Sequence, residues 1–435
     1  MLVICFLNYV FIKYIYGLLV YWICYISMKI LIVSQYFWPE EFTINEVAKT
    51  LVEKGNVVDV LTCKPNYPGG KTLSGYPAWK CQQENHQGVG IHRIPFLPRG
   101  KSRWSLAINY LSFVISGLVF GPWMLRKKKY DVIFVYSTSP IFQAIPGMFI
   151  GWLKGCSVVL WVQDIWPESL SATGYVKNPV ILKLVEYIVR FIYCQVELLL
   201  VQSQAFLPSV SNLVSVTPII YQPNSVSDIF ITKVIDEVPY IEGLDKGFSV
   251  MFAGNIGAAQ GVSVIVEAAS ILKQYTDIHF VILGDGSSRE WMLKEAQQRE
   301  LVNLHLPGRF PVETMPGFMQ KASVLLVTLT DKPIFALTVP NKVQAYLAIG
   351  RPIIACLNGE GARIVVEAGA GLATPAEDAK ALAETILNVY KLTPVERKNM
   401  GENGRKYFQK HFNHDHLVDQ LIGHLQSVSQ NGKEI

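Results

Sequence analysis

Short, continuous apolar runs alternate with helical stretches along most of this chain. Apolar runs of four to six residues separated by helices are typical of parallel strands that are covered on both faces. The predicted strands cover residues 30–34, 57–62, 131–137, 157–164 and 198–203, with a helix expected over 45–54, and then residues 248–254, 279–286, 324–329 and 352–357. The pattern therefore predicts an α/β fold made of two doubly wound, Rossmann-like domains.

Length and a change of composition suggest where these domains end. A chain of 435 residues is too long for one ordinary core and fits two domains of about 200 residues each. A stretch of mixed charge before residue 247 separates the two sets of strands. We predict an N-terminal domain over 28–225, a linker over 226–246, a C-terminal domain over 247–395, and a charged helical tail over 396–435 that returns to the first domain.

Residues 1–27 form an apolar extension that carries a single charge, Lys13. By composition this segment resembles a transmembrane or signal segment, but no small-residue cleavage site follows it. Met28 instead begins the first predicted strand directly. Two interpretations stay open, an upstream extension outside the fold and an N-terminal membrane anchor.

A second apolar segment, residues 104–125, contains no charge and lies between Arg103 and Arg126. If it crossed a bilayer, the strands before and after it could not share one sheet, so we expect it to stay on one side. It is either a long buried helix or a helix in the lipid interface, with the basic residues 126–129 on anionic headgroups. In the second case the inserted side chains would be Trp104, Phe113, Phe120 and Trp123.

Charge and cysteine content exclude several classes. The net charge of +5 is modest, and the other basic residues are dispersed, which does not fit a nucleic-acid-binding surface. The seven cysteines form no CxxC pair, so neither a disulfide framework nor a zinc site is indicated, and a reducing cytosol is expected. The histidines show no metal-ligand spacing, and we expect chemistry without a metal or another cofactor.

Two segments have the layout of phosphate-binding elements. Pro340 and Asn341 open a predicted helix whose free backbone N–H groups and Lys342 ammonium would attract an anion. Residues 252–262, FAGNIGAAQGV, place glycines between a strand and a helix, where the backbone can approach a diphosphate. Together they indicate a nucleotide-linked substrate.

Eight motifs in order resemble a known family. They are YFWPE, VQDIWPES, YQPNSVSDIF, FAGNIG followed by GV, VILGDGSS, LPGRF, PNKVQAYLAIGRPII and GAGLATPAED. From Met28 to about Gln426 the chain resembles the bacterial glycosyltransferases of family 4, whose two Rossmann-like domains face a cleft in the GT-B fold. The closest likeness is to the subgroup of WbuB-like fucosamine transferases and WcaI-like colanic acid transferases.

The resemblance places the nucleotide-sugar donor on the C-terminal domain. The chain departs from the family pattern of donor-binding residues in two ways. Ala336 stands eight residues before Gln344, so both glutamates of the family's Glu-x7-Glu pair are absent. Two cations that the family pattern leads us to expect are replaced by Asn255 and Gln260. Lys342 is the predicted replacement, with Arg309 second, because a buried diphosphate needs charge partners. The predicted donor residues are Gly254, Asn255, Gln260, Gly284, Gly286, Gly308, Arg309, Asn341 and Gln344.

Asp164 and Lys342 are the predicted catalytic residues. Asp164 follows a buried strand, where such sheets carry ligands, and would orient a proton of the acceptor hydroxyl; alternatively it caps the next helix. Lys342 could instead be an exposed lysine of a first helical turn, and Gln344 a helix-surface amide. The loop over residues 36–41 is a candidate wall of the acceptor site.

The resemblance implies a retaining glycosyltransferase, metal-independent, that uses a UDP-linked sugar such as N-acetyl-L-fucosamine. The acceptor would be an undecaprenyl-linked oligosaccharide at the inner face of the cytoplasmic membrane, in O-antigen or capsule biosynthesis, with the enzyme peripherally attached. A nucleotide-sugar epimerase of the same architecture and a non-catalytic, membrane-associated assembly subunit remain alternatives. A dinucleotide-dependent oxidoreductase is disfavoured, since no G-x-G-x-x-G follows the first strand.

Overall fold

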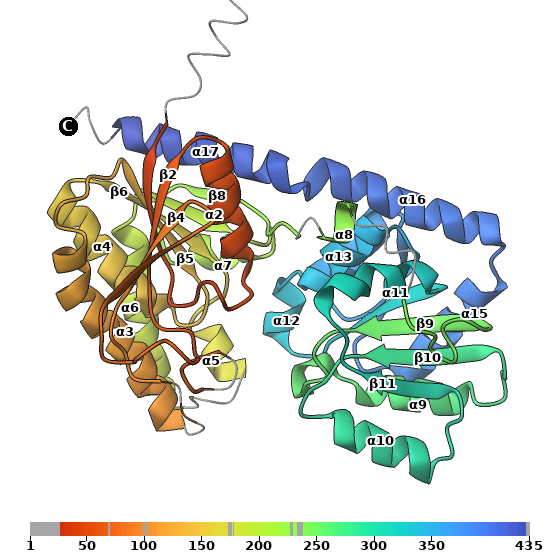
Figure 1. Ribbon diagram of the computed structural model, residues 1–435. Helices are drawn as coiled ribbons and strands as arrows, with labels where there is room; N and C mark the ends of the chain where they lie inside the picture. Colours follow the sequence, from red (N-terminus) through yellow and green to blue (C-terminus); the bar gives the residue numbers. More distant parts are fainter. Residues whose placement is uncertain are drawn as a thin grey trace, which may run out of the picture. The chain divides into compact units, whose positions relative to one another are not determined.

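The computed structural model describes residues 27–431 except 68–69, 99, 101–102, 173–175, 177, 227–228 and 233–237 (Figure 1). The predictions for the apolar extension therefore lie outside the described residues, apart from Ser27. The side chain of Trp104 also lies outside them.

Eight described strands form the first sheet, in the order β3-β4-β2-β1-β5-β6-β7-β8. Neighbouring β1, β2, β4 and β5 pair in parallel, and β3 joins β4 antiparallel at the edge. The strands are β1 (Lys29–Val33), β2 (Val57–Thr62), β3 (Gln82–His86), β4 (Val89–Arg93), β5 (Val132–Ser137), β6 (Ser157–Val162), β7 (Leu198–Val201) and β8 (Ile219–Tyr221). The helices of this part are α2 (Thr43–Glu53), α3 (Arg103–Met124), η1 (Ile141–Gln143), α4 (Ala144–Lys154), α5 (Glu168–Ala172), α6 (Pro179–Cys194), α7 (Phe206–Ser211) and α8 (Ile229–Thr232).

The second sheet has six described strands, all parallel, in the order β11-β10-β9-β12-β13-β14. The strands are β9 (Phe248–Ala253), β10 (Ile278–Leu283), β11 (Leu304–Gly308), β12 (Val324–Thr328), β13 (Ile353–Cys356) and β14 (Gly371–Thr374). The helices are η2 (Ala258–Gln260), α9 (Ser263–Ile271), α10 (Arg289–Gln298), η3 (Val312–Thr314), α11 (Met315–Lys321), α12 (Pro333–Leu337), α13 (Asn341–Ile349), α14 (Glu360–Glu367) and α15 (Ala379–Lys391).

Successive residues of β9 show why the second sheet is covered on both faces. Met251 belongs to a core that also contains Val343 and Tyr346 of α13. Val250 and Phe252 belong to a second core, built with α9 and α15. Because side chains of a strand alternate between faces, a fully apolar strand must be buried on both sides. Helix α13 therefore packs against the face of the sheet to which Met251 points.

The predicted fold class is confirmed. Every strand predicted from an apolar run is present within a few residues of its expected bounds, as is the helix expected over 45–54. The strands that pattern reading missed, β3, β4, β8, β11 and β14, are short or partly polar and lie toward the sheet edges.

The chain forms two compact units. One contains residues up to Leu160 with Gln195–Glu197 and Ile422–Ile435, and the other contains Trp161–Cys194 and Leu198–Leu421. The tail forms α16 (Pro394–His411) and α17 (His414–Asn431). The end of α17 belongs to the N-terminal unit, where the Ser157 hydroxyl donates to the Val428 carbonyl at 3.2 Å. The predicted boundaries at residues 225 and 246 stay predictions.

Candidate functional site

Glycines join the ends of β9 and β10 backbone to backbone. Gly254, directly after β9, has φ +126°, and its N–H donates to the Leu283 carbonyl at 2.8 Å. Gly284, directly after β10, has φ +141°, and a Cβ there would overlap the Gly254 carbonyl. A backbone with these φ angles and this spacing requires glycine. The predicted loops therefore lie side by side at the carboxyl edge of the sheet.

Further glycines complete this edge. Gly284 N–H donates to the Gly308 carbonyl at 2.8 Å, which brings in the end of β11. A Cβ on Gly286 would lie 2.7 Å from Oδ1 of Asn255. The structure thus brings together Gly254, Asn255, Gly284, Gly286 and Gly308 from three adjacent strand ends.

Lys342 reaches this glycine cluster from the first turn of α13. Its Nζ donates to Oε1 of Gln260 at 2.6 Å and lies 3.6 Å from the centre of the Phe252 ring. A Cβ on Gly254 would lie 2.8 Å from Cε of Lys342, so the glycine makes room for the lysine. Lys342, Gln260 and Gly254, all predicted site residues, therefore lie in contact, and their roles in donor binding stay predictions.

The Lys342 ammonium has no acidic partner among the residues that the structure describes. Burial lowers the pKa of Lys342 to about 7, because the ammonium is partly removed from water without a compensating negative charge. An amide oxygen and the face of an aromatic ring are weaker substitutes for an anion. The arrangement is thus a cation that lacks a counter-ion.

The backbone of α13 adds to this positive end. Asn341 is the exposed first residue of the helix, and Pro340 at the N-cap offers no side-chain cap to the free N–H groups. The helix is held in place because the buried Tyr346 hydroxyl accepts from Ala253 N–H at 3.1 Å. Free amide hydrogens, the helix dipole and Lys342 therefore act at one edge of the sheet, as an oxyanion of a diphosphate requires.

The other predicted residues lie around or away from this cluster. Gln344 is buried, and its amide donates to the Asn224 carbonyl at 2.9 Å, so it engages a different partner from Lys342. Arg309 follows Gly308 and is exposed. Asp164 follows β6 of the first sheet and is half-buried. The roles given to these residues stay predictions.

Arg289, the first residue of α10, is a cation that sequence reasoning missed. Its Nη2 donates to the Leu306 carbonyl at 3.2 Å and lies 3.8 Å from where a Cβ on Gly308 would be. An available signal was the basic residue at the start of a helix just after GDGSS, the same arrangement that identified Lys342. Arg289 is a second candidate for charge at the glycine cluster.

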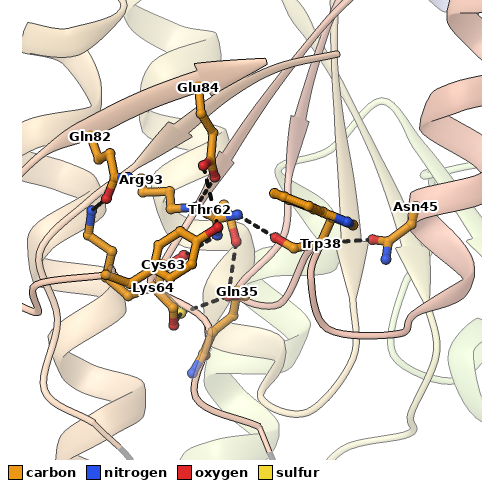
Figure 2. A network of polar contacts seen from close by, with 10 residues as sticks. Gln35, Trp38, Asn45, Thr62, Cys63, Lys64, Gln82, Glu84 and Arg93 are labelled. Carbon is orange, nitrogen blue, oxygen red and sulfur yellow. Dashed lines mark hydrogen bonds and ion pairs between the residues drawn. The ribbon is translucent and has the colours of Figure 1, made fainter. Parts of the chain in front are cut away.

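A separate polar network lies at the carboxyl edge of the first sheet (Figure 2). Arg93, at the end of β4, is fully buried, forms an ion pair with Glu84 and donates to the Trp38 carbonyl. Lys64, just after β2, donates to Oε1 of Gln82 at 2.9 Å, and burial, with Arg93 nearby, lowers its pKa to about 8. The bond from Arg93 to Trp38 fixes the loop over residues 36–41, the predicted acceptor wall, to the end of β4.

The sequence is similar to known glycosyltransferases, above all in the domain that carries the glycine cluster. Residues 247–391 match the family described as glycosyl transferases group 1. The probable glycosyltransferase WbjE of Pseudomonas aeruginosa is 27% identical over 294 residues, which are 65% of this chain and 73% of that protein. The putative colanic acid biosynthesis glycosyl transferase WcaI of Escherichia coli (strain K12) is 26% identical over 341 residues, 74% of this chain and 82% of that protein.

Solved structures agree on the architecture. Sucrose-phosphate synthase from Thermosynechococcus elongatus has a TM-score of 0.70 at 18% identity, with 92% of this chain and 98% of that chain covered. Anabaena HepE in complex with UDP has a TM-score of 0.65 at 14% identity, with 92% and 100% covered. The two α/β domains therefore have the GT-B fold.

These findings support a glycosyltransferase similar to those of family 4, the resemblance that the motifs carry. The family match covers the domain that carries the glycine cluster and Lys342. The absence of both family glutamates, with Ala336 in the first position, is a departure of this chain within that type.

Proposed function

We propose that the protein transfers a sugar from a nucleotide-sugar donor, UDP-linked, to a lipid-linked oligosaccharide during O-antigen or capsule synthesis, with retention at the sugar carbon. The observation that carries the donor assignment is the Lys342 ammonium, which lies at the glycine cluster with no acidic partner in the described part of the chain. The names of WcaI and of the O-antigen chain mannosyltransferase C of Escherichia coli, 25% identical over 174 residues, support the pathway class. The UDP complex of HepE supports the choice of base.

In this proposal the departing diphosphate is the group that the site stabilises. Negative charge builds on its oxygens as the bond to the sugar carbon breaks, and Lys342 with the N–H groups of α13 would stabilise that charge more in the transition state than in the ground state. Asp164 would orient a proton of the acceptor hydroxyl through a charge-assisted hydrogen bond. The enzyme would act at the inner face of the cytoplasmic membrane, where a lipid-linked acceptor is held.

Donor binding tests the proposal directly. A panel of UDP-, GDP- and dTDP-sugars, mixed singly with the full chain, should raise the unfolding temperature only with the correct base. A donor at 100 times its dissociation constant stabilises the folded state by about 2.7 kcal/mol. The measurement is a thermal-shift assay, followed by product analysis with and without a lipid-linked acceptor.

The same assay separates the alternatives. An epimerase would convert the donor without any acceptor, and a non-catalytic assembly subunit would show no shift with any nucleotide sugar. Stabilisation together with acceptor-dependent transfer is the expected result. Either of the other two outcomes would contradict the proposed transfer.

The proposed role of Asp164 has its own test. Asp164→Asn keeps the shape of the side chain but removes its charge, so transfer should fall about tenfold, the cost of weakening one charge-assisted hydrogen bond. Donor-induced stabilisation should be unchanged. Glu168→Gln, an exposed carboxylate in the following helix, is the matched control. Full transfer by a folded Asp164→Asn protein would remove Asp164 from the mechanism.

A further inference from the structure

The outer side of α3 is a continuous apolar stripe. Its exposed members recur every three or four residues, which places them on one side of the helix. Ile115 is 62% exposed and Val119 60% exposed, values unusual for large aliphatic side chains. The members are Ile108, Leu111, Ile115, Val119 and Trp123.

The inner side of α3 packs on the protein. Phe113 is fully buried, which corrects the expectation that it would insert into lipid, whereas Phe120 and Trp123 are exposed as expected. A Cβ on Gly117 would lie 2.7 Å from Pro146 of α4, so the two helices touch closely (Figure 1). By length and composition the helix could cross a membrane, but 39% of its most apolar window is buried in the protein.

The sheet excludes a transmembrane path for α3. The strand before it, β4, and the strand after it, β5, belong to one sheet and are joined through β2 and β1. A helix whose two ends return to the same sheet stays on one side of a bilayer. Its exposed stripe can therefore meet only the surface of a membrane or another protein.

Helix α4, which packs beside α3, also exposes large apolar side chains. Trp152 is 76% exposed and Leu153 49% exposed. Phe149 stacks on Trp152 with 5.9 Å between ring centres. Aromatic side chains of this kind are typical of the membrane–water interface.

A basic rim borders this surface. Arg126, Lys127, Lys128 and Lys129 follow α3 and are exposed. Lys154 at the end of α4 donates to the Leu125 carbonyl at 2.9 Å, which places it at the same end. Neither helix nor the segment 125–130 contains an acidic residue. Lys128 pairs with Asp59, whereas the ion pairs of the described residues include none for Arg126, Lys127 or Lys129. Apolar side chains bordered by such cations fit anionic lipid.

We propose that the outer sides of α3 and α4, together with residues 126–129, form a lipid-docking face that lies in the headgroup region of an anionic bilayer. This docking face extends the proposed action at the membrane and rests on that proposal. A second copy of the chain is a poorer occupant, because pairing two such faces would bring positive surfaces together with no acid to neutralise them. The attachment is reversible, since apolar contact and a few cations do not equal a spanning helix.

Vesicle co-sedimentation of the full chain tests the proposal, with neutral phosphatidylcholine vesicles beside vesicles that contain phosphatidylglycerol. Ile115→Gln with Val119→Gln should lower binding to both at least about tenfold, since two aliphatic side chains no longer enter the bilayer. Lys127→Gln with Lys129→Gln should lower binding to the anionic vesicles about thirtyfold and leave neutral vesicles unaffected, since each cation near such a surface adds about 1 kcal/mol. Lys128 is left intact because it pairs with Asp59 at 2.6 Å.

A matched control replaces aliphatic side chains elsewhere. Val302→Gln with Val395→Gln alters residues 80% and 67% exposed in the other compact unit and should bind vesicles as the parent protein does. Donor-induced stabilisation, unchanged in all variants, shows that each is folded and keeps this test separate from the donor assignment. Undiminished vesicle binding by the Ile115/Val119 variant would overturn the proposal. So would a dimer in the absence of lipid that this variant converts to a monomer.

Discussion

Lys342→Ala should lower the rate of sugar transfer about a hundredfold while the protein stays folded. The loss corresponds to one preorganised group that stabilises charge in the transition state, about 2.7 kcal/mol. Folding should tolerate the change because, among the residues that the structure describes, the partners of the ammonium are the Gln260 amide and the Phe252 ring, and its burial is unfavourable in the free protein. The measurement is steady-state transfer with a saturating acceptor, with unfolding temperature as the check on folding.

The pH dependence of donor affinity distinguishes a charge effect from lost packing. With a pKa of about 7 in the free protein, Lys342 is mostly charged below pH 7 and mostly neutral above it. A diphosphate binds the charged form and raises this pKa. Affinity should therefore be constant below about pH 7 and fall about tenfold per pH unit above it, up to the pKa of the bound state.

Two variants serve as controls for this prediction. Lys342→Arg keeps its charge throughout and should lose the decline above pH 7 while it retains part of the activity. Lys294→Ala removes an exposed lysine of α10 and should change nothing. A Lys342→Ala enzyme with full turnover, or with the parent's pH dependence, would exclude Lys342 from the donor site.

The central strands and the helix that begins at Asn341 could be predicted because their signals are local in sequence. A run such as residues 248–253, apolar except for Ser249, is typical of a sheet covered on both faces, and glycines next to it commonly allow close backbone approach. The edge strand β3, with the sequence QQENH, carries no such signal, since its stability comes from pairing with β4. Edge strands are thus set by tertiary contacts that one sequence window does not contain.

The side of helix α13 on which the Gln344 side chain lies could not be predicted, for a related reason. Residues two apart in a helix point to roughly opposite sides, so Lys342 and Gln344 do not share a face. Helix α13 is buried almost all round from Val343 onward, which removes the polar stripe that would have revealed its orientation. The Asn224 carbonyl that Gln344 contacts is 120 residues away in sequence.

The sequence pattern also did not predict the buried cations of the first sheet. Arg93 ends a strand and would usually be placed in solvent, yet it is fully buried. Its position depends on Glu84 of the neighbouring strand and on the carbonyl of Trp38. Only pairing brings these groups together, because 55 residues separate Trp38 from Arg93.

Gly284→Ala should destabilise the C-terminal sheet by about 3 kcal/mol and abolish donor binding. The new Cβ would overlap the Gly254 carbonyl, a backbone atom that no side-chain rotation can move, and the residue would keep a φ of +141°. The two strand ends would have to separate, and with them the amides that face the diphosphate. For a domain of this size the unfolding temperature should fall by about 6 to 12 °C, and donors should cause no shift.

Comparison with Gly308→Ala separates the cost of the steric overlap from the cost of a positive φ. Gly308 also has a positive φ, +103°, but only Arg289 Nη2 lies near a Cβ there, at 3.8 Å. The Gly308→Ala protein should therefore lose only the stability that an unfavourable φ costs, about 1 kcal/mol. Its unfolding temperature should be higher than that of Gly284→Ala. Equal stabilities for the two variants would mean that backbone strain alone acts at these positions. A Gly284→Ala protein as stable as the parent would show that the strand ends are not in contact, and the glycine cluster would lose its basis as a diphosphate site.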